Sequence, residues 1–276
     1  MNPVAFFFLI GVFSPLVTYN LYILTIYLRT RFSKDPDYVK YPKYLIIVAK
    51  VHRLMMGFNP YYTRLSKPSK RLFISRVIHL MVFKRFVGRQ GLQITIEKKI
   101  MVIGALVQLT FGLKKYALPK FNFIALYPSS FFSTVLNQQV KGLTYRKGAL
   151  LFSWYDLVKG YTIHDDNLNL ALHEWAHAFI MDHYDHAAYW VYTRLNNSLD
   201  NLDDLYADMQ TYRDSQNYLR DYAFTNTHEF FAVCVEHFFE TPAKFNQRYP
   251  ELFKDLCTVL NQNPLNQEND YAFTAK

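Results

Sequence analysis

The chain has 276 residues, of which 51% are hydrophobic and 18% aromatic, so a large core is available and wholesale disorder is excluded. Only two cysteines are present, Cys234 and Cys257, and neither belongs to a C-x-x-C pair. This pattern excludes a disulfide framework and a cysteine zinc site, and it is typical of a reducing compartment.

The net charge of +9 is distributed unevenly along the chain. Residues 29–120 contain 20 Lys and Arg against three acidic residues, a net of +17, whereas residues 121–276 contain 11 against 19, a net of −8. A well-solvated surface is one interpretation of the basic part. The other is contact with anionic lipid headgroups, to which each nearby Lys or Arg contributes about 1 kcal/mol. No nucleic-acid motif accompanies these residues, so nucleic acid is not expected as a partner.

The N-terminus contains a long apolar run. Residues 4–28 carry no charged side chain, and an apolar helix of about 20 residues spans a bilayer. A cleaved signal peptide would need a basic start and a small-residue cleavage site, and neither is present. Because Arg29 and Arg31 follow at once, the positive-inside rule places the rest of the chain in the cytoplasm. We therefore expect a single-pass membrane protein with a transmembrane anchor at residues 1–30.

Three further regions follow the anchor. Residues 31–56 are expected to form a basic juxtamembrane linker, residues 57–265 one folded domain, and residues 266–276 a polar tail. Apolar spacing or long apolar runs predict helices over 69–86, 97–113, 167–184, 227–240 and 242–261. Strands are predicted over 121–128 and 147–154. The expected fold is α+β and mostly helical, with a small sheet beside the helix at 167–184.

The predicted helix at 167–184 contains the sequence HEWAH. His173 and His177 are four residues apart, so they project from one face of a helix and can occupy adjacent corners of a zinc site. Glu174 is rotated by about 100° and can reach a water molecule at the metal without ligating it. A chance match is the alternative. The apolar surroundings favour the metal, because they bury both histidines and buried histidines need partners.

The third ligand is less clear from the sequence. The spacing of His183 fits the metzincin pattern, but Ile180 replaces the glycine that turns the chain there. If the helix continues, His183 points about 240° away from His177, so we reject it as a ligand. The predicted downstream helix offers three glutamates instead: Glu229, Glu236 and Glu240. The first two are seven residues apart and share a face, so periodicity does not separate them.

Several motifs in this order resemble the MtfA-like zinc peptidases, the family of Mlc titration factor A, whose catalytic core is related to that of anthrax lethal factor. They are LLFSWYDLVKG (150–160), HDDNLNLALHEWAH (164–177) and EFFAVCVEHFFETPAKFNQRYPELF (229–253). The resemblance implies a zincin-like metallopeptidase domain with one zinc ion. It also implies that Glu229 is the third ligand, with Glu236 behind it.

The same resemblance implies a role for Tyr222, seven residues before Glu229, as a hydrogen-bond donor to the developing oxyanion. The alternative is that this tyrosine, one of 22, only packs. The region 146–153 would supply a strand that lines the cleft. Ile180 replaces an aspartate that is usual in these families, so another group, such as Asp182 or a backbone carbonyl, is expected to orient the histidines.

Two functions follow as hypotheses. The first is a membrane-anchored zinc-dependent metallopeptidase that cleaves a peptide or protein substrate, with Glu174 as general base. The alternative is a zinc-containing binding module that sequesters a transcriptional regulator or another protein partner. The intact Glu174 favours chemistry, because a structural zinc has no use for a neighbouring base.

Overall fold

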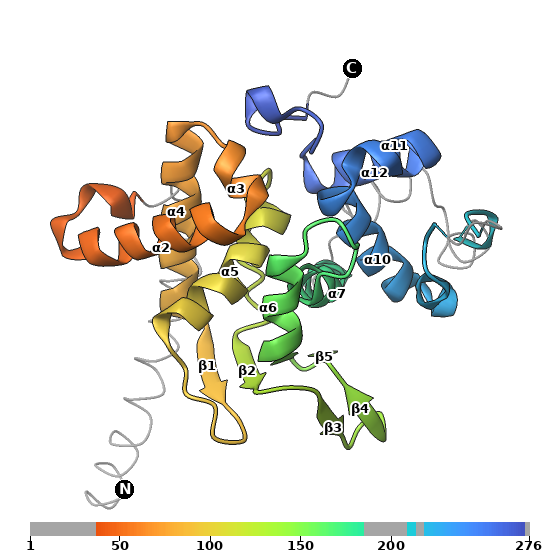
Figure 1. Cartoon of the computed structure of the whole chain (residues 1–276), viewed down its shortest axis with the longest axis horizontal. Coiled ribbons are helices and arrows are strands. Elements are labelled where there is room, and N and C mark those ends of the chain that lie inside the picture. The colour runs from red at the N-terminus through yellow and green to blue at the C-terminus, as the bar shows by residue number, and fades with distance from the viewer. Residues whose placement is uncertain (1–36, 185–208, 214–217, 274–276) are drawn as a thin grey trace, which may run out of the picture. The chain divides into compact units, whose positions relative to one another are not determined.

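The computed structural model describes residues 37–184, 209–213 and 218–273 (Figure 1). The predicted anchor at residues 1–30 lies outside the described residues. Among the residues that are described, no helix combines the length and the apolar character needed to cross a membrane.

The described residues form a mostly helical α+β fold with a small sheet, as predicted. The helices are α2 (Leu45–Phe58), α3 (Pro60–Arg64), α4 (Lys67–Phe83), α5 (Ile96–Thr110), α6 (Trp154–Thr162), α7 (Leu170–Tyr184), α10 (Thr227–Glu240), α11 (Pro242–Arg248) and α12 (Pro250–Leu260). The strands are β1 (Arg85–Gly88), β2 (Phe123–Tyr127), β3 (Phe131–Ser133), β4 (Gln138–Val140), β5 (Gly142–Tyr145) and β6 (Ala149–Ser153). Short 3-10 turns include η3 (Asp221–Thr225) and η4 (Gln267–Asn269).

The main sheet has four strands in the order β1-β2-β6-β5. The two predicted strands correspond to β2 and β6, which pair in parallel in the interior of the sheet. Strand β5 pairs antiparallel with β6 and forms one edge. Strands β3 and β4 make a separate two-stranded antiparallel hairpin (Figure 1). Within the described residues, β5 therefore lies at the edge of the sheet next to α7, with no strand on its outer side.

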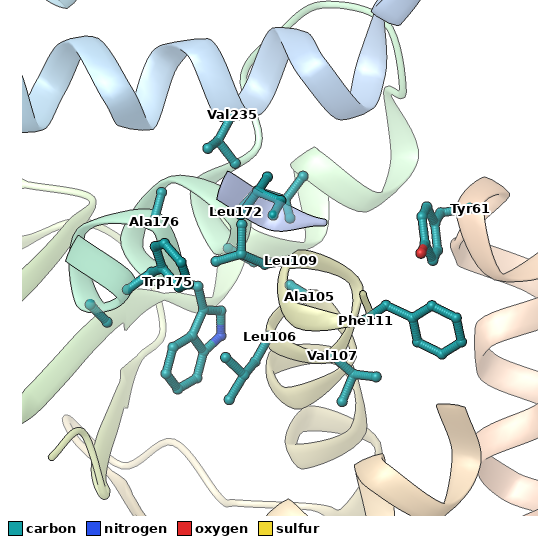
Figure 2. Close-up of a cluster of buried hydrophobic side chains, with 14 of the residues drawn as sticks. Tyr61, Ala105, Leu106, Val107, Leu109, Phe111, Leu172, Trp175, Ala176 and Val235 are labelled. Atoms are coloured by element: carbon teal, nitrogen blue, oxygen red, sulfur yellow. The ribbon is translucent and has the colours of Figure 1, made fainter. Parts of the chain in front are cut away.

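Helix α5 lies in the centre of the hydrophobic core (Figure 2). From α7, Leu172 and Trp175 pack into this cluster, and the Trp175 indole Nε1 donates to the carbonyl of Val102 at 2.9 Å. Trp175 is completely buried, and a fully buried aromatic side chain contributes several kcal/mol to stability. The core therefore fixes the rotation of α7 and directs the opposite side of this helix toward α10 and β5.

The prediction that residues 31–56 form a linker is wrong for its C-terminal part. The compact unit begins at Asp37, and residues 45–56 belong to helix α2. Val51 and Met55, one turn apart, are completely buried. Gly104 of α5 makes this approach possible, because a Cβ atom there would lie 2.8 Å from the Met55 sulfur. His52 and Arg53, which lie between these two positions, are exposed and hid the amphipathic pattern.

The predicted polar tail also differs from the structure, since residues 266–273 pack on the domain. Tyr271 is 2% exposed, stacks on Tyr61 with 4.0 Å between ring centroids, and donates its hydroxyl to the Tyr61 carbonyl. The burial of this one aromatic side chain holds the segment on the domain, although the residues around it are polar. Residues 274–276 lie outside the described residues.

Asp270 connects the same segment to the start of α4, and its contribution to stability can be measured. Its carboxylate accepts hydrogen bonds from the Ser66 backbone N–H, the Ser66 hydroxyl and the Ser69 hydroxyl. Burial opposes ionisation, but these bonds outweigh it and lower the pKa of Asp270. A lowered folded-state pKa contributes stability above the unfolded pKa, about 3.9, that is lost as the pH falls further. We expect Asp270→Asn to cost about 1–2 kcal/mol at pH 7 and less at pH 3, measured by urea unfolding.

Candidate metal centre

Helix α7 carries the HEWAH sequence without interruption. It begins at Leu170, where the Asn169 side chain accepts the backbone N–H of Leu172 at 3.1 Å, and it continues past Ile180 to Tyr184. The turn that a metzincin-type third histidine requires is therefore not present at Ile180. The side chain of His183 lies outside the described part of the helix.

Helix α10 begins opposite α7. The Asn226 side chain caps it by accepting the backbone N–H groups of His228 and Glu229, each at 3.0 Å. Asparagine is among the preferred residues at this position because its oxygen satisfies amides that have no partner within the helix. The cap places Glu229 in the first turn, with its carboxylate directed at α7.

Three side chains from these two helices converge. The Nε2 atoms of His173 and His177 are 3.1 Å apart, and the Glu229 Oε2 atom lies 3.0 Å from the first and 3.3 Å from the second. Their three donor atoms all lie within 4.8 Å of one another. Both histidines are 7% exposed. Of the three glutamates considered, Glu229 is therefore the one that meets both histidines at a point suited to a single ion.

The charges around this point favour a cation. Burial raises the pKa of Glu229, but hydrogen bonds with His173 and His177 outweigh it and hold this pKa well below its usual range. Burial lowers the pKa of His173, but the charge of Glu236 and the hydrogen bonds to Glu229 and Glu236 raise it to about 10. Two nitrogen donors and a carboxylate oxygen fit the His₂Glu ligand set of catalytic zinc sites.

Glu236 orients one of the histidines. One of its carboxylate oxygens lies 3.2 Å from His173 Nδ1 and accepts a hydrogen bond from Arg220 at 2.5 Å, and the other accepts from the Asn169 backbone N–H at 2.9 Å. A carboxylate behind a metal-binding histidine fixes its ring orientation and tautomer. Asp182, which was considered for this role together with a backbone carbonyl, accepts the backbone N–H of Lys120 at its Oδ1. For His177, the Nδ1 atom has no hydrogen-bond partner among the described residues.

The side chain of Glu174 projects from α7 toward the edge strand β5. It is 5% exposed, and its Oε2 atom accepts a hydrogen bond from the Thr144 hydroxyl at 2.7 Å. The same hydroxyl lies 2.9 Å from the Glu174 backbone carbonyl, so strand β5 is linked to α7 at this residue. Burial raises the pKa of Glu174. A carboxyl group with a raised pKa is suited to take up and return a proton near neutral pH.

Gly142 leaves the space that the Glu174 side chain occupies. A Cβ atom on Gly142 would lie 2.2 Å from Glu174 Oε1, so any larger residue must push the carboxylate aside. We expect Gly142→Ala to lower kcat of any hydrolysis by about tenfold or more, because small displacements of a catalytic group are costly. Zinc affinity, measured by competition with a chromogenic chelator, should stay unchanged. An unchanged kcat would contradict this packing.

Tyr222 lies in η3 at the edge of the site and is half exposed. Its ring centroid is 6.1 Å from that of His173. Burial and the neighbouring Glu229 raise the pKa of its hydroxyl, which therefore stays protonated at neutral pH. Arg220, just before this turn, donates to the Asn167 carbonyl at 2.7 Å as well as to Glu236. The turn that presents Tyr222 is thus tied to the loop before α7.

A cleft of about 700 Å³ contains these groups. It is lined by His173, Glu174, His177, Tyr222 and Glu229 on the helical side, and by residues 138–144 on the sheet side. The strand that borders the cleft is β5. The region 146–153, which was expected to line the cleft, contains β6 instead, and β6 lies one position inside the sheet. An edge strand offers unpaired backbone groups to an extended peptide, whereas an interior strand does not.

Three residues of the site were not found from the sequence: Gly142, Thr144 and Arg220. Each acts on another side chain across a gap of at least 16 positions in the sequence. No spacing rule connects such positions. The signal that was available was the seven-residue spacing of Glu229 and Glu236, which places both carboxylates on the side of α10 that faces α7.

Two histidines one turn apart on one helix and a glutamate from a second helix define a candidate single-ion metal centre of the His₂Glu class. The chain matches the model of the glucose-regulated metallo-peptidase M90 family over residues 45–260, and it belongs to this family. Membership of a metallopeptidase family implies a metal ion and a peptide substrate.

Curated relatives agree with this assignment. Mlc titration factor A of Yersinia pestis (strain Pestoides F) is 26% identical over 230 residues, which cover 75% of this chain and 82% of that protein. Mlc titration factor A of Yersinia pseudotuberculosis serotype O:1b (strain IP 31758) gives the same values. The resemblance to MtfA-like proteins that the ordered motifs indicated is therefore confirmed.

Proposed function

We propose that the protein is a zinc-dependent peptidase that hydrolyses internal or terminal peptide bonds of an extended substrate. The observation that carries the proposal is the convergence of His173, His177 and Glu229 beside a buried Glu174, in a cleft bordered by a free strand edge. The two histidines and Glu229 would hold one zinc ion. Zinc in such a site would supply Lewis acidity, which lowers the pKa of water so that it can lose a proton and act as a nucleophile at neutral pH.

The side chains of the chain have separate tasks in this reaction. Glu174 takes a proton from the attacking water at its carboxylate and returns it to the nitrogen of the leaving amine, so that the water is divided between the two products. Thr144 holds Oε2 of this carboxylate during both transfers. Tyr222 donates its hydroxyl to the oxygen on which negative charge develops. Strand β5 aligns the substrate backbone.

A second function has a specific observation in its favour. The relatives are named as titration factors of Mlc, and such a name is compatible with sequestration of a regulatory protein. In this chain the metal would then shape a docking surface for a transcriptional regulator. The buried Glu174, linked to β5 through Thr144, is a costly feature for a surface that only binds, because its burial opposes ionisation.

The test of the peptidase proposal uses the full-length chain in detergent micelles. The zinc-loaded protein is incubated with a mixed library of unstructured peptides, beside the same protein treated with a chelator, and new termini are identified by mass spectrometry. Cleavage in the zinc-loaded sample alone is the expected result. Stoichiometric zinc without any cleavage would overturn the peptidase proposal and favour the binding module.

We further propose that residues 4–28 anchor the protein in a membrane, with the folded domain in the cytoplasm and its basic surface near anionic lipid headgroups. The uncharged run followed by Arg29 and Arg31 supports this proposal. Leu45 and Ile46 near the start of the compact unit are 58% and 84% exposed, which is compatible with a lipid surface nearby. Alkaline carbonate should leave the full chain in the membrane pellet and release a deletion of residues 4–28. Release of the full chain would overturn the anchor.

A further inference from the structure

The hairpin formed by β3 and β4 carries no charged side chain. We call residues 129–140 the uncharged hairpin. It lies within residues 121–140, a stretch of the sequence without a single Asp, Glu, Lys or Arg in a chain that is 19% charged. Its strands pair with each other and are not part of the four-stranded sheet (Figure 1). Exposed strands usually carry charges that prevent unwanted pairing, and these strands carry none.

The uncharged hairpin exposes large apolar side chains. Phe132 is 54% exposed, Val135 64% and Leu136 47%. Its base is nevertheless fixed, because Phe131 is buried and stacks on Tyr127 with 3.9 Å between ring centroids. The turn is held by the Ser133 hydroxyl, which accepts the Leu136 backbone N–H at 3.2 Å. A positioned patch of exposed apolar residues with polar neighbours is typical of an interaction site.

The exposed patch is continuous with the cleft. Leu136 lines the cleft together with Gln138, Gln139 and Val140, and after Lys141 the chain enters β5 at Gly142. In the register of the hairpin, Phe132 lies opposite Gln139, so the two side chains project from the same face. One surface therefore extends from Glu174, across the start of β5, to the apolar side chains of the hairpin.

We propose that the uncharged hairpin is a docking surface for apolar side chains of an extended protein substrate, on the carboxyl-terminal side of the bond that is cleaved. This inference rests on the proposed peptidase function. A peptide that pairs antiparallel with β5 runs opposite to it, from Tyr145 toward Gly142. Its C-terminal part must then leave the site over the hairpin. The hairpin itself carries no charge, so its own contacts with a substrate are apolar, and Gln138 and Gln139 can exchange hydrogen bonds with the substrate backbone.

The test compares the zinc-loaded full chain with a triple variant, Phe132→Ser, Val135→Ser and Leu136→Ser, on one mixed peptide library. The wild type should cleave peptides that are enriched in apolar residues on the carboxyl-terminal side of the cut. In the triple variant this enrichment should disappear, and KM for an apolar-rich peptide should rise about tenfold while kcat changes little. Val82→Ser on α4, where the side chain is 61% exposed, is the matched control and should behave as the wild type. No enrichment in the wild type, or an unchanged preference in the triple variant, would overturn the proposal.

A second measurement separates this proposal from the peptidase proposal. The Glu174→Gln protein, with and without the three serine substitutions, is used to capture peptides from the same library. Capture of apolar-rich peptides that depends on the hairpin residues supports the docking surface even if no peptide is ever cleaved. Equal capture by both proteins, or none by either, contradicts it. A wild-type dimer that the triple substitution dissociates, seen by analytical ultracentrifugation, would instead assign the patch to a second copy of this chain.

Discussion

Replacing Glu174 by glutamine is expected to lower the rate of peptide hydrolysis by a factor of about 10²–10⁴, while zinc binding and folding remain intact. Glutamine has the same shape, and its amide oxygen can still accept the hydrogen bond of Thr144. It cannot take a proton from water at neutral pH, so the proton transfer that the reaction needs is lost. The substitution also removes a buried carboxyl group whose ionisation is opposed by burial, and therefore it should not destabilise the fold.

The measurement is kcat/KM on a peptide found in the library screen, together with the zinc content by atomic absorption and the thermal unfolding midpoint. Glu268→Gln is the control, because this exposed carboxylate lies in the short turn η4. Turnover at the wild-type rate in the Glu174→Gln protein would show that another group takes the proton. A variant without zinc would show instead that Glu174 helps to hold the metal.

The elements with strong periodicity were predictable from the sequence, because one physical rule decides each of them. The helical apolar pattern around HEWAH predicted α7, and the apolar runs that end at turn residues predicted β2 and β6. Helix α2 was missed since its two completely buried positions, Val51 and Met55, lie among exposed basic and apolar residues. The tail was missed because a single side chain, Tyr271, attaches it to the domain.

The site was predictable to the extent that its residues are neighbours on one helix. His173, Glu174 and His177 follow from helical geometry alone. The choice between Glu229 and Glu236 depends instead on how α10 packs against α7, which no local pattern encodes. The contacts of Gly142 with Glu174 likewise depend on the edge position of β5. Such pairings arise only when distant segments pack together in the folded chain.

Replacing Glu229 by alanine is expected to weaken zinc binding by more than about 100-fold. Losing a residue that only hydrogen-bonds to a metal ligand costs up to about 100-fold, and the loss of a ligand itself should cost more. Glu229 is the carboxylate whose oxygen lies within 3.3 Å of both histidine Nε2 atoms. Without it, only the two histidine nitrogens remain, and no carboxylate balances the charge of the ion. The helix itself should persist, because Asn226 caps α10 through backbone N–H groups that the alanine variant keeps.

The comparison with Glu236→Gln makes this prediction specific. Glu236 touches the other nitrogen of His173, so its loss should weaken zinc binding by about 10–100-fold, less than the loss of Glu229. Glu251→Ala, at an exposed position of α12, should leave the affinity unchanged. Dissociation constants from competition with a chromogenic chelator rank the three variants. If Glu236→Gln were the more damaging change, the carboxylate that completes the centre would be Glu236, and the arrangement of α10 against α7 would have to shift by two turns.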